Sequence, residues 1–393
     1  MEIRNKKTFF LLSFGHCGID WTHALLSSHA SILILPAFSF YRGWNHIMSN
    51  QINLNSVNLM ISAWKEYLDS DYSISSGGRF FTNKKDNNLF YDKFRGNLEL
   101  FGLDRLSIFY ALHDAYAKVK NIEISSIDVI VEHEHVCFNI DLLFQDFKSI
   151  NILLLVRDPR SAIAGYYRGI ERKCVNNSNC YHHQVSKSWA EWKKASQIYY
   201  KYRYYQDDMI NIIKYEDLVQ NIDNTTKKIA QTLGITFNRS LTIPLNADGS
   251  AWRTDTCYIS RNDPDVDRKI FFTMDNIEKR WMSVLNKRDI LSIETVFSKI
   301  MITFDYKKIY KPSIKNKILG FLLALYPKRG INRYSFYSVN ESEKKINVNV
   351  LNLSIIRYLV KFSPLLLLSI CQYFLSFLDN IRIIIGIIPK KYK

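Results

Sequence analysis

Three apolar runs along the chain each end in a short turn and are followed by a segment with helical spacing of apolar residues. The first run is Phe9–Phe14, which ends in the turn Gly15–Gly18. The second is Ile152–Val156, which stops at Arg157, and the third lies at Met209–Tyr215. Buried strands that alternate with helices predict an α/β fold with a central parallel sheet flanked by helices.

The spacing of apolar residues between these runs predicts further elements. A short apolar run follows at Ile32–Leu35, and helices are expected from Asp104, over Ser186–Tyr199 and from Asp223 to Gly234. Segments 275–285 and 289–304 also have helical spacing, whereas the charged segment Asn83–Arg95, rich in asparagine, is expected to be a loop.

The turn Gly15–Gly18 joins a predicted strand to a predicted helix, an arrangement that can bind an anion. The free N–H groups of the first helical turn point into such a loop, and the helix dipole favours negative charge there. The loop lacks the GxxxxGK[ST] pattern, so the usual signature of nucleotide triphosphatases is missing.

Arg157 stands at the end of the buried run Ile152–Val156, where an α/β protein places its ligand crevice. A fixed cation at that position indicates an anionic ligand. The alternative is a salt bridge between Arg157 and the neighbouring Asp158 at the end of the strand.

A further apolar strand, Ile127–Val131, ends in alternating carboxylates and imidazoles at residues 132–135. Because side chains alternate along a strand, His133 and His135 should share one face and Glu132 and Glu134 the other. One of the two pairs should face the crevice. A solvated strand end and a metal site at the histidine pair are the alternatives.

Three segments in order, His16–Trp21, Arg157–Gly165 and Ile213–Leu218, resemble motifs of the PAPS-dependent sulfotransferases, in a divergent bacterial-type branch. The resemblance extends over about the first 305 residues. It implies a P-loop-like three-layer fold and transfer of a sulfuryl group from PAPS (3′-phosphoadenosine 5′-phosphosulfate) to a hydroxyl, for which we expect a saccharide or glycan.

The resemblance also implies which residues bind the donor. The first loop would hold the 5′-phosphosulfate and Arg157 the 3′-phosphate, while a late polar loop contributes Arg253. The full set implied for donor binding is His16, Cys17, Gly18, Ile19, Asp20, Trp21, Arg157, Gly165, Tyr215 and Arg253. Where the family has a basic residue, a serine and two hydroxyl residues in the first loop, this chain has His16, Cys17, Ile19 and Asp20, and Gly165 replaces a serine.

The family places its catalytic base at the end of a strand between the first loop and the arginine motif. His135 is the expected base, because an imidazole titrates near neutral pH and the residue precedes an apolar pair as the family's histidine does. Glu134 is the second candidate and His133 remains open. A protonated His16 would contact the leaving group.

The sequence is also compatible with two other functions. The substitutions Ile19, Asp20 and Gly165 favour an inactive protein that binds PAPS or its bisphosphate product. A small-molecule kinase is disfavoured by the missing Walker lysine. No metal is expected, since the spacing of Cys174 and Cys180 with the following histidines fits no standard zinc ligand set.

The composition changes near residue 306, which predicts a catalytic domain at 1–305 and a C-terminal extension at 306–393. The extension holds 16 of the 53 Lys and Arg but only 3 of the 37 Asp and Glu, and so carries most of the net charge of +16. Its apolar runs, Phe362–Leu378 and Ile381–Ile388, with basic flanks suit an anionic membrane surface better than nucleic acid. A membrane span and a terminal helix packed on the globular core are the alternatives. The apolar run after Lys7 is too short for a signal peptide, so we expect a cytoplasmic protein, peripheral at the inner face of a membrane.

Overall fold

The computed structural model describes most of the first 325 residues. The described residues are 2–36, 38–50, 54–69, 80–81, 83–135, 137–173, 178–205, 207–246, 249, 252, 277, 281–311 and 313–325. Most of the predicted C-terminal extension, the late loop with Arg253 and the cysteine-containing segment 174–177 lie outside these residues.

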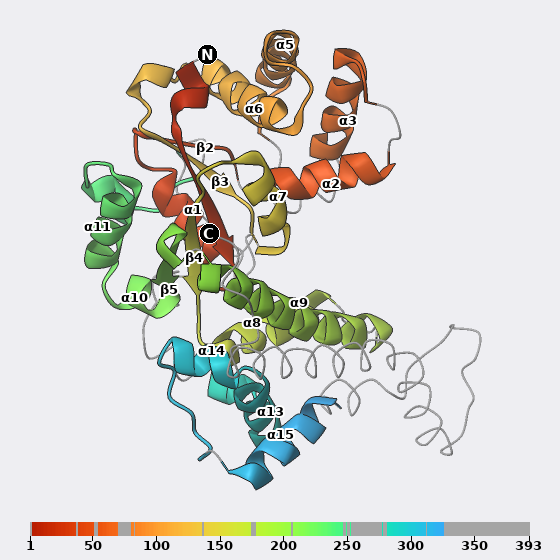
Figure 1. Ribbon diagram of the computed structural model, residues 1–393, viewed down its shortest axis with the longest axis vertical. Helices are drawn as coiled ribbons and strands as arrows, with labels where there is room; N and C mark the ends of the chain where they lie inside the picture. The colour runs from red at the N-terminus through yellow and green to blue at the C-terminus, as the bar shows by residue number, and fades with distance from the viewer. Residues whose placement is uncertain are drawn as a thin grey trace, which may run out of the picture.

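The centre of the molecule is a parallel sheet of five strands in the order β2-β3-β1-β4-β5 (Figure 1). Each neighbouring pair runs parallel, with Phe9 opposite Asn151 and Val131. The strands are β1 (Lys7–Ser13), β2 (Ile32–Ile34), β3 (Val129–His133), β4 (Asn151–Val156) and β5 (Ile210–Lys214). The predicted parallel α/β architecture is confirmed.

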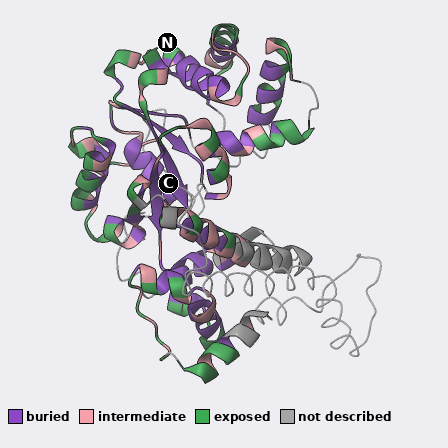
Figure 2. Cartoon of the chain, viewed as in Figure 1, coloured by how far each residue is buried: buried purple, intermediate pink, exposed green. Residues whose placement is uncertain are grey.

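Helices cover both sides of the sheet and complete a P-loop-like three-layer fold (Figure 1). Figure 2 shows that the strands and the inward faces of these helices are buried, so the sheet forms the centre of the core. The helices are α1 (Ile19–Leu26), α2 (Phe40–Asn50), α3 (Val57–Asp69), α5 (Lys84–Phe101), α6 (Arg105–Val119), α7 (Ile140–Asp146), α8 (Pro159–Lys173), α9 (Ser178–Tyr205), α10 (Tyr215–Gln220), α11 (Ile222–Leu233), α13 (Lys287–Val296), α14 (Ser298–Thr303) and α15 (Ile314–Leu325).

Two predicted helix ends are confirmed by their caps. The side chain of Asp104 accepts a hydrogen bond from the Ser107 N–H at the start of α6. Gly234 ends α11 in the left-handed conformation, with φ of 77°. The single helix expected over 289–304 is two helices, α13 and α14, which meet at Phe297.

The loop predicted at Asn83–Arg95 is wrong, because this segment begins helix α5. Asn83 is its N-cap and accepts a hydrogen bond from the Asp86 N–H. Phe90, Phe94 and Leu98 recur every four residues and are buried on one face of the helix. Burial of this apolar stripe outweighs the weak helix propensity of the asparagines.

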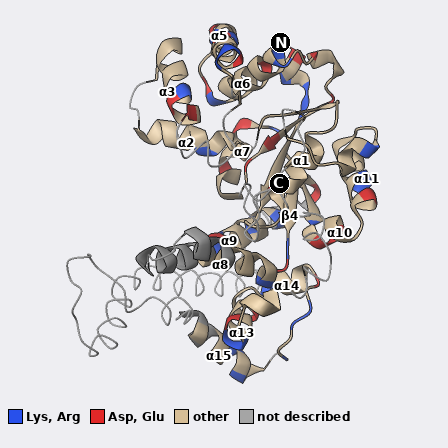
Figure 3. Cartoon of the chain, turned by 180° about the vertical axis from the view of Figure 1, so that it is seen from behind, with Lys and Arg blue, Asp and Glu red and all other residues tan. Residues whose placement is uncertain are grey.

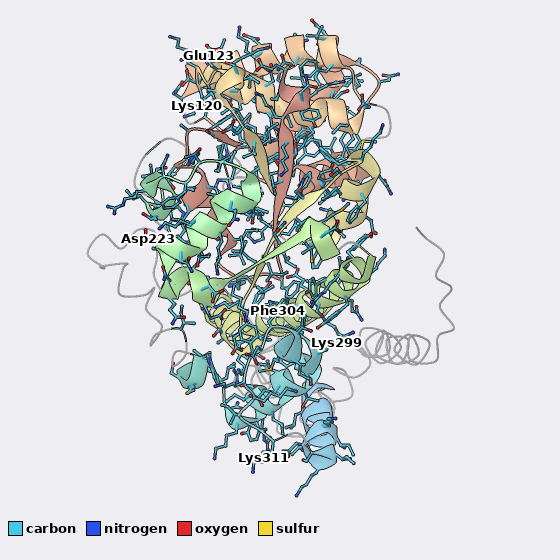
Figure 4. The ribbon with its side chains drawn as sticks, turned by 60° about the vertical axis from the view of Figure 1, so that its left-hand side comes forward. Lys120, Glu123, Asp223, Lys299, Phe304 and Lys311 are labelled. Carbon is cyan, nitrogen blue, oxygen red and sulfur yellow. The ribbon has the colours of Figure 1, made fainter. Side chains whose placement is uncertain are left out.

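The first residues of the predicted extension pack against the rest of the molecule. The Tyr306 hydroxyl donates to Glu216, and the N–H groups of Ile309 and Tyr310 donate to Glu294. Figure 4 shows Phe304 between the sheet and the end of the molecule that carries Lys311. In the described part of the chain, no helix is both long and apolar enough to cross a membrane.

Candidate active site

Four strands end at one edge of the sheet, and the residues that follow them form the candidate site. The glycine loop follows β1, His135 follows β3, Arg157 follows β4 and Tyr215 follows β5. The carboxyl ends of parallel strands are where open α/β sheets bind their ligands.

The glycine loop is packed between two tyrosines. Gly15 and Gly18 have φ of 97° and 81°, in the left-handed region that favours glycine. A Cβ atom would lie 2.3 Å from the Tyr166 hydroxyl at Gly15, and 2.3 Å from the Tyr215 ring at Gly18. Both glycines are therefore required by conformation and by the space available.

Apart from the partly exposed His16, the loop offers main-chain groups rather than side chains to a ligand. The Cys17 thiol is buried and donates to the Gly15 carbonyl, and burial raises the pKa of this thiol. Ile19 is in the core, and the Trp21 ring packs edge-on against Tyr215 with centroids 6.0 Å apart. Gly18 is the N-cap of α1, so the N–H groups of the first helical turn lie at the loop.

Arg157 spans the loop and the wall formed by Tyr215. Its Nη1 donates to the His16 carbonyl at 3.2 Å, and its guanidinium lies 4.2 Å from the centre of the Tyr215 ring. The carboxylate of Asp158 pairs with Arg160 at 2.6 Å, and Arg160 also binds Glu294 at 2.8 Å. Asp158 therefore forms its salt bridge with Arg160, and not with Arg157 as the alternative prediction had it.

Asp20, the acidic residue of the loop, is turned toward two histidines. Its Oδ1 lies 3.7 Å from His133 Nε2 and 3.9 Å from His135 Nδ1. A carboxylate beside a phosphate would be repelled, but the partly exposed imidazole of His135 provides a partner that can carry positive charge. The structure thus places the Asp20 side chain beside His133 and His135 rather than along the main-chain donors of the loop.

Three histidines form a hydrogen-bonded chain at this edge of the sheet. His133 Nε2 is 3.0 Å from His135 Nδ1, and His133 Nδ1 is 3.2 Å from His23 Nδ1. Burial lowers the pKa of His133 well below its usual value and that of His23 to about 4. Sequence reasoning missed His23, although its place three residues after Asp20 puts both on one face of α1.

The carboxylates of the same segment lie on the other face, as the alternation predicted. Glu132 accepts from the Phe40 N–H, and Glu134 accepts from the Tyr41 N–H and the Ser39 hydroxyl, so both hold the start of α2. Burial, with a contribution from the neighbouring Glu132, raises the pKa of Glu134 above its usual value. Glu134 is buried there and points away from His135, which leaves it less suited than His135 to act as a base.

His135 is held in an unusual backbone conformation. Its φ is 60°, a region that residues other than glycine rarely adopt. The Ser13 hydroxyl donates to the His135 carbonyl at 2.7 Å and accepts from the Gly15 N–H at 3.0 Å. Ser13 therefore connects the glycine loop to His135. Nothing in the sequence signals this connection, because a serine at the end of a strand is common.

Two more predicted residues, His16 and Tyr215, pack at the glycine loop, and Gly165 lies in the helix after Arg157. The His16 ring packs on Tyr166 with centroids 3.9 Å apart, and Gly165 is buried in α8. Tyr215 begins α10 and forms the wall beside Gly18 and Arg157. Arg253 lies outside the described residues.

Among the described residues, ligand atoms of Asp20, His133 and His135 all lie within 4.8 Å of one another, a spacing that could hold a metal ion. The centres of the His133 and His135 rings are 5.3 Å apart, and their facing nitrogens are 3.0 Å apart. For this distance between the nitrogens, the ring centres are almost as far apart as they can be, so both nitrogens lie nearly on the line between the centres. The facing nitrogens therefore point at each other, as in a hydrogen bond. A metal would instead require both lone pairs to converge on a third point.

A family model described as "Sulfotransferase family" matches residues 20–239, more than half of the chain. The chain belongs to the sulfotransferase family. The matched residues include Asp20, His135, Arg157 and Tyr215 of the candidate site. No curated protein sequence matches this sulfotransferase.

Several solved sulfotransferase structures are similar to it. The sulfotransferase domain of the Synechococcus PCC 7002 olefin synthase is 16% identical with a TM-score of 0.44, and the match covers 77% of this chain and 95% of that one. The domain from the curacin biosynthetic pathway is 15% identical with a TM-score of 0.47, covering 77% and 98%. Mouse sulfotransferase SULT7A1 complexed with PAP is 13% identical with a TM-score of 0.39, covering 81% and 89%.

The lowered pKa of His23 predicts a pH-dependent loss of stability. Below pH 6.5 the unfolded chain gains a proton on this histidine that the folded chain does not take up until about pH 4. The free energy of unfolding should therefore fall by roughly 3 kcal/mol as the pH is lowered through this window. Chemical denaturation of the His23→Gln variant should show a correspondingly smaller loss between pH 6.5 and pH 4. The exposed His46 of α2 provides the control, since His46→Gln should keep the wild-type slope, and equal slopes for all three proteins would contradict the prediction.

Proposed function

We propose that this sulfotransferase moves a sulfuryl group from PAPS to a hydroxyl group, and that a saccharide or glycan carries that hydroxyl. The observation that supports the proposal is the convergence of the glycine loop, Arg157 and His135 at one edge of the sheet. These residues combine main-chain donors, a fixed cation and a titratable base, which are the groups that sulfuryl transfer needs.

The loop fits the anionic end of such a donor. Main-chain N–H groups at the start of α1 and the guanidinium of Arg157 supply positive potential, and Asp20 is turned away toward His133 and His135. When bound, PAPS supplies the sulfuryl group and leaves as adenosine 3′,5′-bisphosphate. His16, packed on Tyr166 within the loop, is proposed to contact the leaving phosphate, and Arg157 to hold the 3′-phosphate.

His135 is proposed to act on the acceptor. As the acceptor oxygen bonds to sulfur and the bond from sulfur to the phosphate oxygen breaks, the hydroxyl proton passes to Nε2 of His135. The nearby Asp20 carboxylate, 3.9 Å from Nδ1, stabilises the imidazolium that results. The proton then leaves to solvent, which the half-exposed His135 side chain can reach.

Titration of the full-length protein with adenosine 3′,5′-bisphosphate and, separately, with ATP tests the proposed function. We expect saturable binding of the bisphosphate and much weaker binding of ATP, followed by transfer of labelled sulfate from PAPS to a panel of saccharide hydroxyls. Absence of bisphosphate binding would overturn the sulfotransferase reaction. Binding without transfer to any acceptor would favour an inactive bisphosphate-binding protein.

We further propose that the C-terminal extension holds the protein at an anionic membrane surface. In its described part, α15 exposes Ile314 and Ile318 together with Lys315 and Lys317. Figure 3 shows basic residues in blue on this helix. Such a helix combines apolar anchorage with attraction to acidic lipid. The full-length protein should sediment with phosphatidylserine-containing vesicles at low salt and be released at high salt.

The Lys315→Ala/Lys317→Ala double variant should bind these vesicles roughly 30-fold more weakly, because each lysine near the surface contributes about 1 kcal/mol and the two together about 2 kcal/mol. Vesicles of phosphatidylcholine alone are the control. Equal sedimentation with both lipid compositions, or none with either, would contradict the membrane proposal.

A further inference from the structure

The two hydrogen bonds that link His23, His133 and His135 must both run in the same direction along the chain of histidines. This follows from the number of N–H protons that neutral imidazoles carry. His133 uses both ring nitrogens, one toward His135 and one toward His23, and each of these nitrogen pairs needs one proton between its members. A neutral imidazole carries a single N–H, so His133 donates to one neighbour and accepts from the other. Two neutral arrangements satisfy both contacts, and they run in opposite directions.

Only one of these arrangements leaves His135 able to act as a base. In it, His135 Nδ1–H donates to His133 Nε2, and His133 Nδ1–H donates to His23 Nδ1. The lone pair of His135 Nε2 is then bare and can accept a proton. In the reverse arrangement Nε2 carries the proton and His135 can only donate through it.

The geometry of the contacts supports directed hydrogen bonds. The planes of the His133 and His135 rings are inclined by only 24°, and the facing nitrogens lie nearly on the line that joins the ring centres. His23 and His133 are almost fully buried, whereas 42% of the His135 side chain is exposed. The two inner histidines thus form a rigid support, and the outer one faces the space where a substrate can reach it.

We propose that His133 and His23 are positioning residues that hold His135 in the tautomer with its proton on Nδ1 and a bare Nε2. This inference rests on the proposed role of His135 as the base. Burial of His23 and His133 disfavours positive charge on either ring, so a proton taken up by His135 stays there, beside Asp20. The chain orients the base and does not carry its proton inward.

The test compares two replacements of His133 in the full-length protein. His133→Leu removes the acceptor of the His135 Nδ1–H, and transfer should fall about 10-fold to 100-fold with little change in bisphosphate affinity. His133→Gln restores an acceptor at a similar reach and should recover most of that loss. His46→Gln, at an exposed histidine of α2, is the matched control and should keep wild-type activity.

Nitrogen-15 NMR of histidine-labelled protein gives a readout that does not depend on activity. His135, assigned by its loss in the His135→Ala variant, should show a protonated Nδ1 in the wild type. In His133→Leu it should shift toward the Nε2–H form, and in His133→Gln it should remain near the wild-type form. A protonated Nε2 in the wild type, or an unchanged spectrum and rate in His133→Leu, would overturn the positioning role while leaving the proposed function intact.

The His135→Ala variant separates the two proposals. If it retains full transfer, His135 is not the base, and the positioning role falls with it even where NMR confirms the tautomer. If it loses transfer and His133→Leu loses activity that His133→Gln recovers, both are supported. If the His133→Leu protein does not bind the bisphosphate, it is misfolded, and His23→Leu replaces it in the comparison. Slower transfer in His23→Leu than in His133→Gln would then support the positioning role, and equal wild-type rates in both would overturn it.

Discussion

The His135→Ala variant is expected to transfer sulfate about 100-fold to 10,000-fold more slowly than the wild type, the usual contribution of a positioned general base. The structure supports this because His135 is the exposed end of a histidine chain, with Asp20 3.9 Å from its Nδ1. Affinity for the bisphosphate should change little, since the base acts on the acceptor. Steady-state rates with PAPS and a saturating acceptor, together with bisphosphate titration, measure both effects.

His46→Ala is the control for this substitution, because His46 is an exposed histidine on α2 whose ring contacts Asn50 and Tyr67. It should leave the transfer rate unchanged. Glu134→Gln provides a second comparison, as it removes the other candidate base while keeping acceptor and donor atoms at the start of α2. If Glu134→Gln lowers the rate as much as His135→Ala without loss of stability, the base assignment to His135 is wrong.

The sheet could be predicted from the sequence because its strands are short apolar runs with clear ends. Strand β4, residues 151–156, stops at a charged residue followed by a proline, and β1 stops at a glycine turn. The alternation at residues 132–135 also separated the histidines from the glutamates correctly, since side-chain direction along a strand depends only on local geometry.

The contacts between elements could not be predicted in the same way. His23 belongs to α1 and His133 to β3, 110 residues apart, and only the sheet order brings them together. The sequence alone predicts that a carboxylate at Asp20 repels a phosphate. Its contacts with His133 and His135 could not be predicted, because these histidines lie at the end of a different strand of the sheet. Helix α5 was missed because its charged and asparagine residues are typical of a loop when the segment is considered alone. The burial of Phe90 and Phe94, which stabilises the helix, depends on packing against the rest of the chain.

From the sequence, Arg157 could either bind an anionic ligand or form a salt bridge with Asp158. The structure shows that Asp158 pairs with Arg160. Because Arg160 occupies the Asp158 carboxylate, the guanidinium of Arg157 is directed to the His16 carbonyl and the Tyr215 ring instead. This cation thus lies beside the glycine loop, where the family's basic residue is replaced by His16. This position supports the proposal that Arg157 holds the 3′-phosphate.

Replacing Arg157 with alanine should therefore weaken binding of adenosine 3′,5′-bisphosphate by more than about 1.5 kcal/mol, the scale of a charge-assisted hydrogen bond. Arg157→Lys should recover only part of this loss, because an ammonium group keeps the charge but cannot reproduce the planar contact with Tyr215. Isothermal titration calorimetry at fixed ionic strength measures both variants. Arg203→Ala is the matched control, since Arg203 also lies over a tyrosine ring, at 5.7 Å from Tyr199, and is exposed on α9. Equal affinities for the wild type, Arg157→Ala and Arg203→Ala would show that Arg157 supports the loop through the His16 carbonyl and does not hold the nucleotide.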